Sequence, residues 1–352
     1  MSLLLLVDPL ENLQGPLRPP HLLAKELKSY VNIIFASPSI NEVVAETLRS
    51  EGFEVLSLGR HYYFTGSLLI FEAWLRRSRF CPKDDSITIN FSQCFLADSH
   101  IYYAQGPITR AIDDMRPELK LTYRLIYRLA RSFLVKRDNS FNQELRKSSK
   151  FFIANSRFCA TMYESWGISV DDIIYPPLDC EQFKPTTSKP SNDYILTYVG
   201  KEAKYFTLKR IADVGVKIKA FGAKVPYIPK SLLKHPNIEF LGRVSDEELV
   251  DLYSNALYTL FAFTHEPFGY IPVESMACGT PVLTYSKQGP NESVLNGATG
   301  WTTNYDEELV KLAVKIWREG YPSWMKAKCR ERALEFDVKI IADKWLKIIK
   351  QL

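Results

Sequence analysis

The chain has 352 residues, of which 46% are hydrophobic and 24% charged, and its formal net charge is +5. This composition is that of a soluble globular protein with room for a large core and two domains. The six cysteines form no CxxC pair, which excludes the usual signature of a zinc site or a disulfide framework. No segment is long enough for a membrane span, and the apolar start at residues 2–7 is too short for a signal peptide, so we expect a cytoplasmic location.

Short apolar segments in the first half of the chain predict buried strands. Amphipathic segments between several of them predict helices, for example at residues 40–51 and 67–77. This alternation is typical of a parallel sheet. The strands are expected at residues 3–7, 31–36, 54–58, 87–91, 101–104 and 151–154.

One segment carries most of the positive charge. Residues 116–150 contain ten Lys or Arg and only three Asp or Glu. Within this segment, residues 117–137, from Pro117 to Arg137, predict a helix with apolar residues at four-residue spacing and basic residues beside them. The apolar residues are Leu121, Leu125, Leu129 and Phe133, and the basic ones are Lys120, Arg124, Arg128 and Arg131.

This helix has two interpretations, a core-packed helix with a solvated basic rim and a helix that rests in the interface of an anionic membrane. Nucleic acid is a less expected partner, because the segment has few aromatics in a stacking arrangement.

A polar segment with prolines, KPTTSKPSN at residues 184–192, interrupts the alternation of strands and helices. Strands are expected again at residues 194–199, 216–221, 238–241, 256–263 and 281–285, and Ser245 to Glu248 form a capping box that begins a helix. The sequence therefore predicts an α/β protein with two doubly wound, Rossmann-like domains, residues 1–180 and 181–335, that face a central cleft.

The segment HEPFGYIPVESMACGTPVLTY, residues 265–285, follows the strand expected at residues 256–263. Gly269 permits close approach of the backbone to a ligand, and Pro272 favours the first turn of a helix, whose free N–H groups suit a phosphate. Glu266 and Glu274 flank this turn, and a carboxylate can accept two hydrogen bonds from the diol of a ribose or a hexose. The segment therefore predicts a site for a sugar nucleotide.

The same segment, with its E-x7-E spacing, resembles retaining glycosyltransferases of the GT-B fold, family four (glycosyl transferases group 1). Three other segments resemble the family in the same order along the chain: IIYPPLDCEQFKP, NIEFLGRVSDEELVDLYSNA and GPNESVLNGATGW. The resemblance covers most of the chain. It implies that a C-terminal helix, residues 336–352, crosses back to the N-terminal domain.

The resemblance implies roles for residues of the second domain. Glu266 would hold the hydroxyls of the transferred sugar and face its anomeric centre, and Glu274 would bind the ribose. Backbone groups would contact the sugar and diphosphate at Phe268, Gly269 and Tyr270, and the base at Arg243 and Val244.

The resemblance also implies two cations for the diphosphate. The family's Gly-Arg…Lys pair corresponds here to Gly200-Lys201 followed by Lys204 or Lys209, of which Lys209 is favoured. Lysine in place of arginine keeps the charge and loses the planar guanidinium.

Two positions of the first domain depart from the family's pattern. Gly15 is the one glycine of the turn from Gln14 to Arg18, where the family often has Gly-Gly-x-x-Arg. Gln105 stands where the family often has a histidine near the donor sugar.

The implied activity is transfer of a hexose, with retention, from a nucleotide-diphosphate sugar to a hydroxyl of a glycan, a lipid-linked sugar or another acceptor. The sequence offers no convincing nucleophile, which favours front-face attack, and no metal or other cofactor is expected, because lysines and a helix terminus neutralise the leaving group. The alternatives are a sugar-nucleotide epimerase of the GT-B fold and a basic nucleic-acid-binding or DNA-modifying protein. If the acceptor is lipid-linked, the protein is expected to be peripheral on the cytoplasmic face of a membrane.

Overall fold

The structure is a computed structural model that describes residues 2–13, 15–82, 86–119, 121–222 and 228–352. Gln14 and Lys120 of the predicted turn and helix lie outside the described residues. The chain divides into two compact units. Unit 1 comprises Met1–Thr109, Ser132–Pro177 and Val338–Leu352, and unit 2 comprises Arg110–Arg131 and Leu178–Asp337. The boundaries expected from the sequence, at residues 180 and 335, lie beside two of these divisions.

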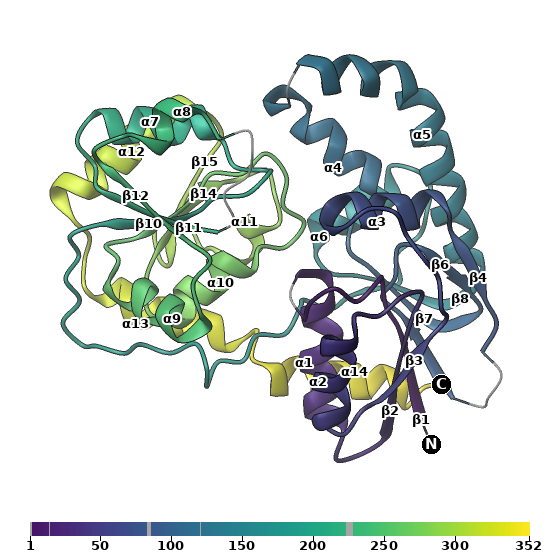
Figure 1. Cartoon of the computed structure of the whole chain (residues 1–352). Helices are drawn as coiled ribbons and strands as arrows, with labels where there is room; N and C mark the ends of the chain where they lie inside the picture. The colour runs from purple at the N-terminus through teal and green to yellow at the C-terminus, as the bar shows by residue number, and fades with distance from the viewer. Residues whose placement is uncertain (1, 14, 83–85, 120, 223–227) are drawn as a thin grey trace. The chain divides into compact units, whose positions relative to one another are not determined.

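Unit 1 contains a seven-stranded parallel sheet in the order β3-β2-β1-β5-β7-β8-β9 (Figure 1). All six predicted strands are confirmed, and the short edge strand β9 and a separate two-stranded sheet of β4 and β6 were not predicted. The strands are β1 (Ser2–Leu6), β2 (Asn32–Ser37), β3 (Glu54–Ser57), β4 (Ser78–Phe80), β5 (Ile87–Asn90), β6 (Phe95–Ala97), β7 (Ser99–Ala104), β8 (Ser149–Ala154) and β9 (Asp172–Ile173).

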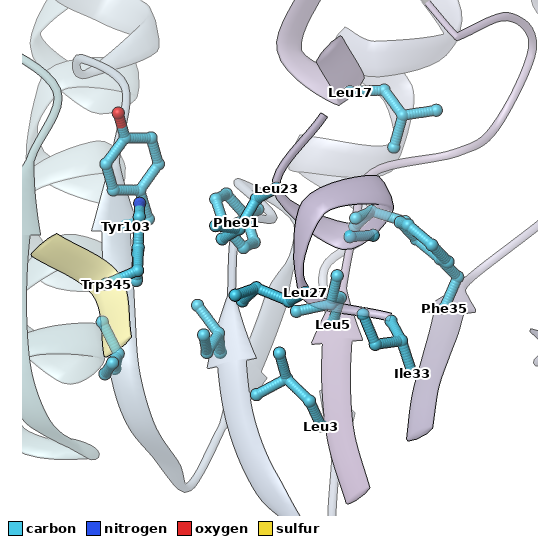
Figure 2. Packing of buried hydrophobic residues seen from close by; sticks show 14 of the residues in the cluster. Leu3, Leu5, Leu17, Leu23, Leu27, Ile33, Phe35, Phe91, Tyr103 and Trp345 are labelled. Atoms are coloured by element: carbon cyan, nitrogen blue, oxygen red, sulfur yellow. The ribbon is translucent and has the colours of Figure 1, made fainter. Parts of the chain in front are cut away.

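Both faces of the central strands of this sheet are buried, which explains why β1 is mostly apolar, whereas the edge strand β3 is largely exposed. Leu3 and Leu5 of β1 belong to one core cluster, whereas Leu4 and Leu6 belong to another, because successive side chains of a strand point to opposite faces. Figure 2 shows the first cluster, in which Trp345 packs with aromatic and aliphatic side chains of the sheet. The C-terminal helix α14 (Val338–Ile349) therefore completes the core of unit 1.

The remaining helices of the first half connect these strands. Their bounds are η1 (Gly15–Leu17), α1 (Arg18–Leu27), α2 (Glu42–Ser50), α3 (Gly66–Leu75), α4 (Ile108–Met115), η2 (Arg116–Glu118), α5 (Leu121–Lys147) and α6 (Arg157–Glu164).

Helix α5 is longer than the helix predicted at residues 117–137, and it does not bury the apolar face that the sequence identifies. Leu121, Leu125, Leu129 and Phe133 are exposed, whereas Tyr127 is buried. The interpretation of these four residues as a core-packed face is therefore wrong. Helical spacing identifies an apolar face and does not say which of two apolar faces meets the core.

Unit 2 contains a six-stranded parallel sheet in the order β12-β11-β10-β13-β14-β15 (Figure 1). This is the order of a Rossmann-like doubly wound sheet, so the predicted fold class is confirmed. The edge strand β15 was not predicted. The strands are β10 (Ile195–Tyr198), β11 (Ile218–Phe221), β12 (Ile238–Gly242), β13 (Thr259–Phe261), β14 (Val282–Tyr285) and β15 (Gly300–Thr303).

Two of the helices of unit 2, α9 (Asp246–Asn255) and α10 (Tyr270–Ala277), were predicted from local signals. Ser245 accepts from the backbone N–H of Glu248, whose side chain accepts from the backbone of Ser245, so the predicted capping box is confirmed. The helices are α7 (Tyr205–Asp213), α8 (Lys230–Leu233), α9 (Asp246–Asn255), α10 (Tyr270–Ala277), α11 (Pro290–Ser293), α12 (Asp306–Glu319) and α13 (Trp324–Leu334). In the part of the chain that the structure describes, no helix combines the length and apolarity needed to cross a membrane.

Candidate functional site

The E-x7-E segment lies at the carboxyl end of β13, as predicted. The strand is shorter than expected and ends at Phe261, so a loop of eight residues leads to α10. Gly269 immediately precedes α10 and has φ of 95°, a left-handed conformation that favours glycine. The loop therefore delivers Glu266 to the N-terminal end of a helix, where backbone N–H groups have no partner within the helix.

Glu266 is half-buried and bound by the backbone of its own loop. One carboxylate oxygen, Oε1, accepts from the N–H groups of Phe268, at 3.3 Å, and Gly269, at 3.1 Å. Desolvation raises the pKa of Glu266 to about 7. The hydrogen bond from the backbone N–H of Phe268 and the charge of His265 lower this pKa, whereas the nearby Glu202 carboxylate raises it further. A carboxyl group with this pKa changes its charge near neutral pH.

Glu274 is buried, with 3% of its surface exposed, and lies in α10 one turn after Gly269. The sequence placed it in the first turn, whereas α10 begins at Tyr270 and Glu274 is its fifth residue. Its Oε2 accepts from the hydroxyl of Tyr253, at 2.9 Å. Tyr253 belongs to α9 and was not predicted as a site residue, because no local pattern links it to a position 21 residues away.

A second loop holds the Glu266 loop in place. The backbone N–H of Gly289 donates to the carbonyl of Glu266, at 3.0 Å. A Cβ atom on Gly289 would lie 1.9 Å from the carbonyl oxygen of Pro267, and one on Gly269 would lie 2.8 Å from Cγ of Pro290. Only glycine permits this approach at Gly289, so the two loops pack directly against each other.

Gly200 follows β10, and Arg243 and Val244 follow β12, two strands of unit 2 that are separated by β11. Gly200 follows β10, and the ring of Tyr198 fills the space where its side chain would be, because a Cβ there would lie 2.7 Å from the ring. Gly222, which was not predicted, follows β11 and donates to the carbonyl of Gly242, at 2.7 Å, directly before Arg243. The carboxyl ends of β10, β11 and β12 thus place these residues along one edge of the sheet, where ligands of such sheets bind.

The two favoured lysines line one cavity of about 300 Å³ in unit 2. Lys201 is exposed, with Nζ 3.4 Å from Glu202, and Nζ of Lys209 lies 2.7 Å from Asp213. The alternative, Lys204, is held by Asp306, at 2.7 Å, and over the ring of Tyr285. All three lysines therefore have an acidic partner within unit 2, and Lys201 and Lys209 differ from Lys204 in that they line the cavity.

The two predicted residues of the first domain lie together in unit 1. Gly15 has φ of 63° and begins the short helix η1. The side-chain amide of Gln105, directly after β7, donates to the carbonyls of Pro16, at 3.4 Å, and Phe91, at 3.3 Å. Gln105 therefore braces the Gly15 turn at the carboxyl edge of this sheet.

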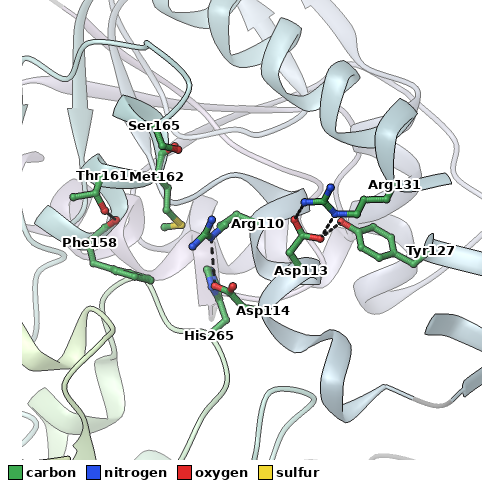
Figure 3. A network of polar contacts seen from close by, with 10 residues as sticks. All are labelled: Arg110, Asp113, Asp114, Tyr127, Arg131, Phe158, Thr161, Met162, Ser165 and His265. Atoms are coloured by element: carbon green, nitrogen blue, oxygen red, sulfur yellow. Dashed lines mark hydrogen bonds and ion pairs between the residues drawn. The ribbon is translucent and has the colours of Figure 1, made fainter. Parts of the chain in front are cut away.

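His265, next to Glu266, is buried and contacts Asp114 of α4 (Figure 3). Its Nδ1 lies 2.8 Å from Oδ2 of Asp114, which also lies 3.6 Å from Nε of Arg110. The side chain of His265 is thus engaged by a carboxylate within unit 2. Among the residues that the structure describes, no group of His, Cys, Asp or Glu is arranged to hold a metal ion.

Comparison with known proteins identifies the family of this segment. The model of the family "Glycosyl transferases group 1" matches residues 224–333, which include Glu266 and Glu274. A probable sucrose-phosphate synthase of Thermosipho melanesiensis is 31% identical over 117 residues, 32% of this chain and 27% of that protein. The alpha-1,3/1,6-mannosyltransferase ALG2 of Eremothecium gossypii is 29% identical over 120 residues, 29% of this chain and 23% of that protein. The chain thus spans about a quarter of the length of these curated relatives.

A solved structure shows the fold of the whole chain. The crystal structure of Anabaena HepE in complex with UDP aligns over 100% of both chains, with a TM-score of 0.71 and 16% identity. The predicted resemblance is thereby confirmed. This protein has the GT-B fold, and its residues 224–333 match the Glycosyl transferases group 1 family.

Proposed function

We propose that this protein is a retaining glycosyltransferase that moves a hexose from a nucleotide-diphosphate sugar to an acceptor hydroxyl. The observation that carries the proposal is the pair of glutamates around the N-terminal end of α10, within the segment that matches the family. Glu274 is fixed by Tyr253, and Glu266 by the backbone of its loop. Fixed acceptors of hydrogen bonds suit the hydroxyls of a bound sugar nucleotide, because they need no reorganisation when the ligand binds.

In the proposed reaction, Glu266 binds hydroxyls of the transferred sugar and faces its anomeric centre, and Glu274 binds the ribose. Lys201 and Lys209 neutralise the leaving diphosphate, so that no metal ion is needed. The acceptor oxygen attacks from the face that the diphosphate leaves, the bond to the diphosphate breaks, and the acceptor proton passes to the diphosphate. Retention follows, because both events take place on one face of the sugar.

The related structures suggest the first donor to test. HepE was crystallised with UDP, with UDP and glucose, and with UDP-glucose. We therefore propose a UDP-sugar as the donor, with a glycan or a lipid-linked sugar as the acceptor, and the cytoplasm, where nucleotide sugars are made, as the place of action.

The test begins with a thermal-shift screen of UDP-, GDP- and ADP-sugars, because a ligand that binds the folded state raises the melting temperature. The best donor is then incubated with and without acceptor saccharides, and the configuration of the product is determined by NMR. We expect a product of unchanged anomeric configuration that forms at the same rate with EDTA present. An inverted product would refute the mechanism, and conversion of the donor without an acceptor would indicate an epimerase instead.

One variant and a matched control connect the reaction to the site. Glu266→Gln should lower turnover more than donor affinity, whereas Glu247→Gln on the exposed first turn of α9 should change neither. Unchanged kinetics of Glu266→Gln would contradict the proposed role of this carboxylate.

A further inference from the structure

Asp114 of α4 contacts the residue that directly precedes Glu266. Its Oδ2 lies 2.8 Å from Nδ1 of His265 and 3.6 Å from Nε of Arg110, and all of these side chains belong to unit 2 (Figure 3). A carboxylate has no proton to donate, so Nδ1 of His265 carries the hydrogen of this bond. Asp114 is therefore joined to the candidate site through one imidazole ring.

This imidazole ring is held in one orientation. His265 has only 5% of its surface exposed, and its ring cannot turn without breaking the bond to Asp114. The next residue, Glu266, accepts from the N–H groups of Phe268 and Gly269, which needs a defined path of the backbone. A side chain fixed directly before Glu266 limits the paths that the backbone can take, and such support keeps a functional group in its working geometry.

Charge connects the same two positions. Desolvation raises the pKa of Glu266, and the charge of His265 acts against that rise. Removal of the Asp114 carboxylate would leave a positive charge on His265 without this partner. Glu202, after β10, and Tyr198, of β10, also face Glu266, and they act on it directly and not through the imidazole.

We propose that Asp114 is a positioning residue for the Glu266 carboxylate and acts on it through His265. Asp114 keeps the imidazole in one orientation and supports its positive charge beside a desolvated carboxylate. An effect on catalysis rests on the proposed function, in which Glu266 binds the transferred sugar. The effect on Glu266 itself does not, because it needs no donor.

The neighbouring residue of α4 provides a matched control. Asp113 pairs with Arg131, at 2.7 Å, and accepts from the hydroxyl of Tyr127, at 3.1 Å (Figure 3). Asp113→Asn thus removes an ion pair from the same helix without touching the bond to His265. A general loss of helix packing would appear in this variant as well as in Asp114→Asn.

The experiment follows the ionisation of Glu266 on the full chain without any donor. The carboxyl carbons of the glutamates are isotopically labelled, and the NMR signal of Glu266 is assigned by its absence in Glu266→Gln. The signal is titrated in the wild type, Asp114→Asn, Asp113→Asn, His265→Asn and the double variant Asp114→Asn/His265→Asn.

We expect Asp114→Asn to move the titration midpoint of Glu266 upward, because the charge that favours the carboxylate loses its partner. His265→Asn should move it upward too, whereas Asp113→Asn should leave it unchanged. In the double variant Asp114→Asn should add nothing to the effect of His265→Asn. The direction identifies the route, because direct repulsion between two carboxylates would make Asp114→Asn lower the midpoint.

Kinetics with the best donor provide the second measurement. Asp114→Asn should lower kcat roughly tenfold and leave donor affinity within about twofold of the wild type, since it displaces one carboxylate of the site. Asp114→Glu, which keeps the charge, should recover part of the turnover, and Asp113→Asn should have the kinetics of the wild type.

A midpoint that is unchanged or lowered in Asp114→Asn or in His265→Asn would overturn the proposal. An upward shift by Asp114→Asn that persists in full beside His265→Asn would overturn it as well, because the effect would not pass through the imidazole. A wild type that turns over no donor would refute the proposed function, whereas the titration would still decide whether Asp114 acts on Glu266.

Discussion

Replacing Glu266 by glutamine should make the protein more stable at pH 8 while it lowers turnover. Burial raises the pKa of Glu266 from its ordinary value of 4.5 to about 7. Between pH 4.5 and about pH 7, the folded state keeps a proton on Glu266 that the unfolded state has released. The free energy of unfolding of the wild type therefore falls as the pH rises through this range. At about 1.4 kcal/mol per pKa unit, the loss is at most about 3 kcal/mol, and it is complete above pH 7.

Glutamine removes this loss without removing the local hydrogen bonds. Its side-chain oxygen can still accept from the N–H groups of Phe268 and Gly269, and it carries no charge to desolvate. The difference in unfolding free energy between Glu266→Gln and the wild type should therefore grow by up to about 3 kcal/mol between pH 4.5 and pH 8.

Chemical denaturation of both proteins at pH 4.5, 6, 7 and 8 measures this difference, with Glu247→Gln as the exposed control. Two results would contradict this reasoning: a stability difference that is independent of pH, or a Glu266→Gln variant that is less stable than the wild type at pH 8. Either result would show that burial does not raise the pKa of Glu266.

Three further predictions concern the donor site. Glu274→Gln should weaken donor binding roughly ten- to a hundredfold in calorimetry, because a charged hydrogen-bond partner is lost. Tyr253→Phe should weaken donor binding less. Equal donor affinity of the wild type and both variants would contradict this prediction. Gly289→Ala should lower the free energy of unfolding by about 1–3 kcal/mol, because its Cβ would collide with Pro267; an unchanged melting temperature would show that the loops can separate. Lys201→Met and Lys209→Met should each weaken binding of UDP and leave binding of uridine unchanged; equal loss for both ligands would argue against phosphate contacts.

The sequence predicted the parts of the fold that depend on local pattern. The buried strands of both sheets are apolar, because helices cover both faces, and the capping box of α9 involves residues three positions apart. The short strands β4, β6 and β9 are set by pairing partners elsewhere in the chain, so their own residues carry little signal.

The candidate site was predicted where one segment supplies both the turn and its functional groups. Gly269 and the two glutamates lie within nine residues, and local spacing was enough to place them. Two other contacts connect separate segments of the chain. Tyr253 donates a hydrogen bond to Glu274, and Gly289 packs so closely against Pro267 that a side chain would not fit. Such contacts depend on tertiary packing, which a single sequence does not reveal.

The contact between the Glu266 loop and the Gly289 loop has a consequence for attempts to change donor preference. An exchange of residues 265–270 alone for those of a related protein would change the backbone that packs against Gly289 and Pro290. These two residues contact Pro267 and Gly269 so closely that no space remains. The graft would either shift the carboxylate at position 266 or open the turn that precedes α10. Residues 287–291 should therefore be exchanged together with residues 265–270, as one cassette.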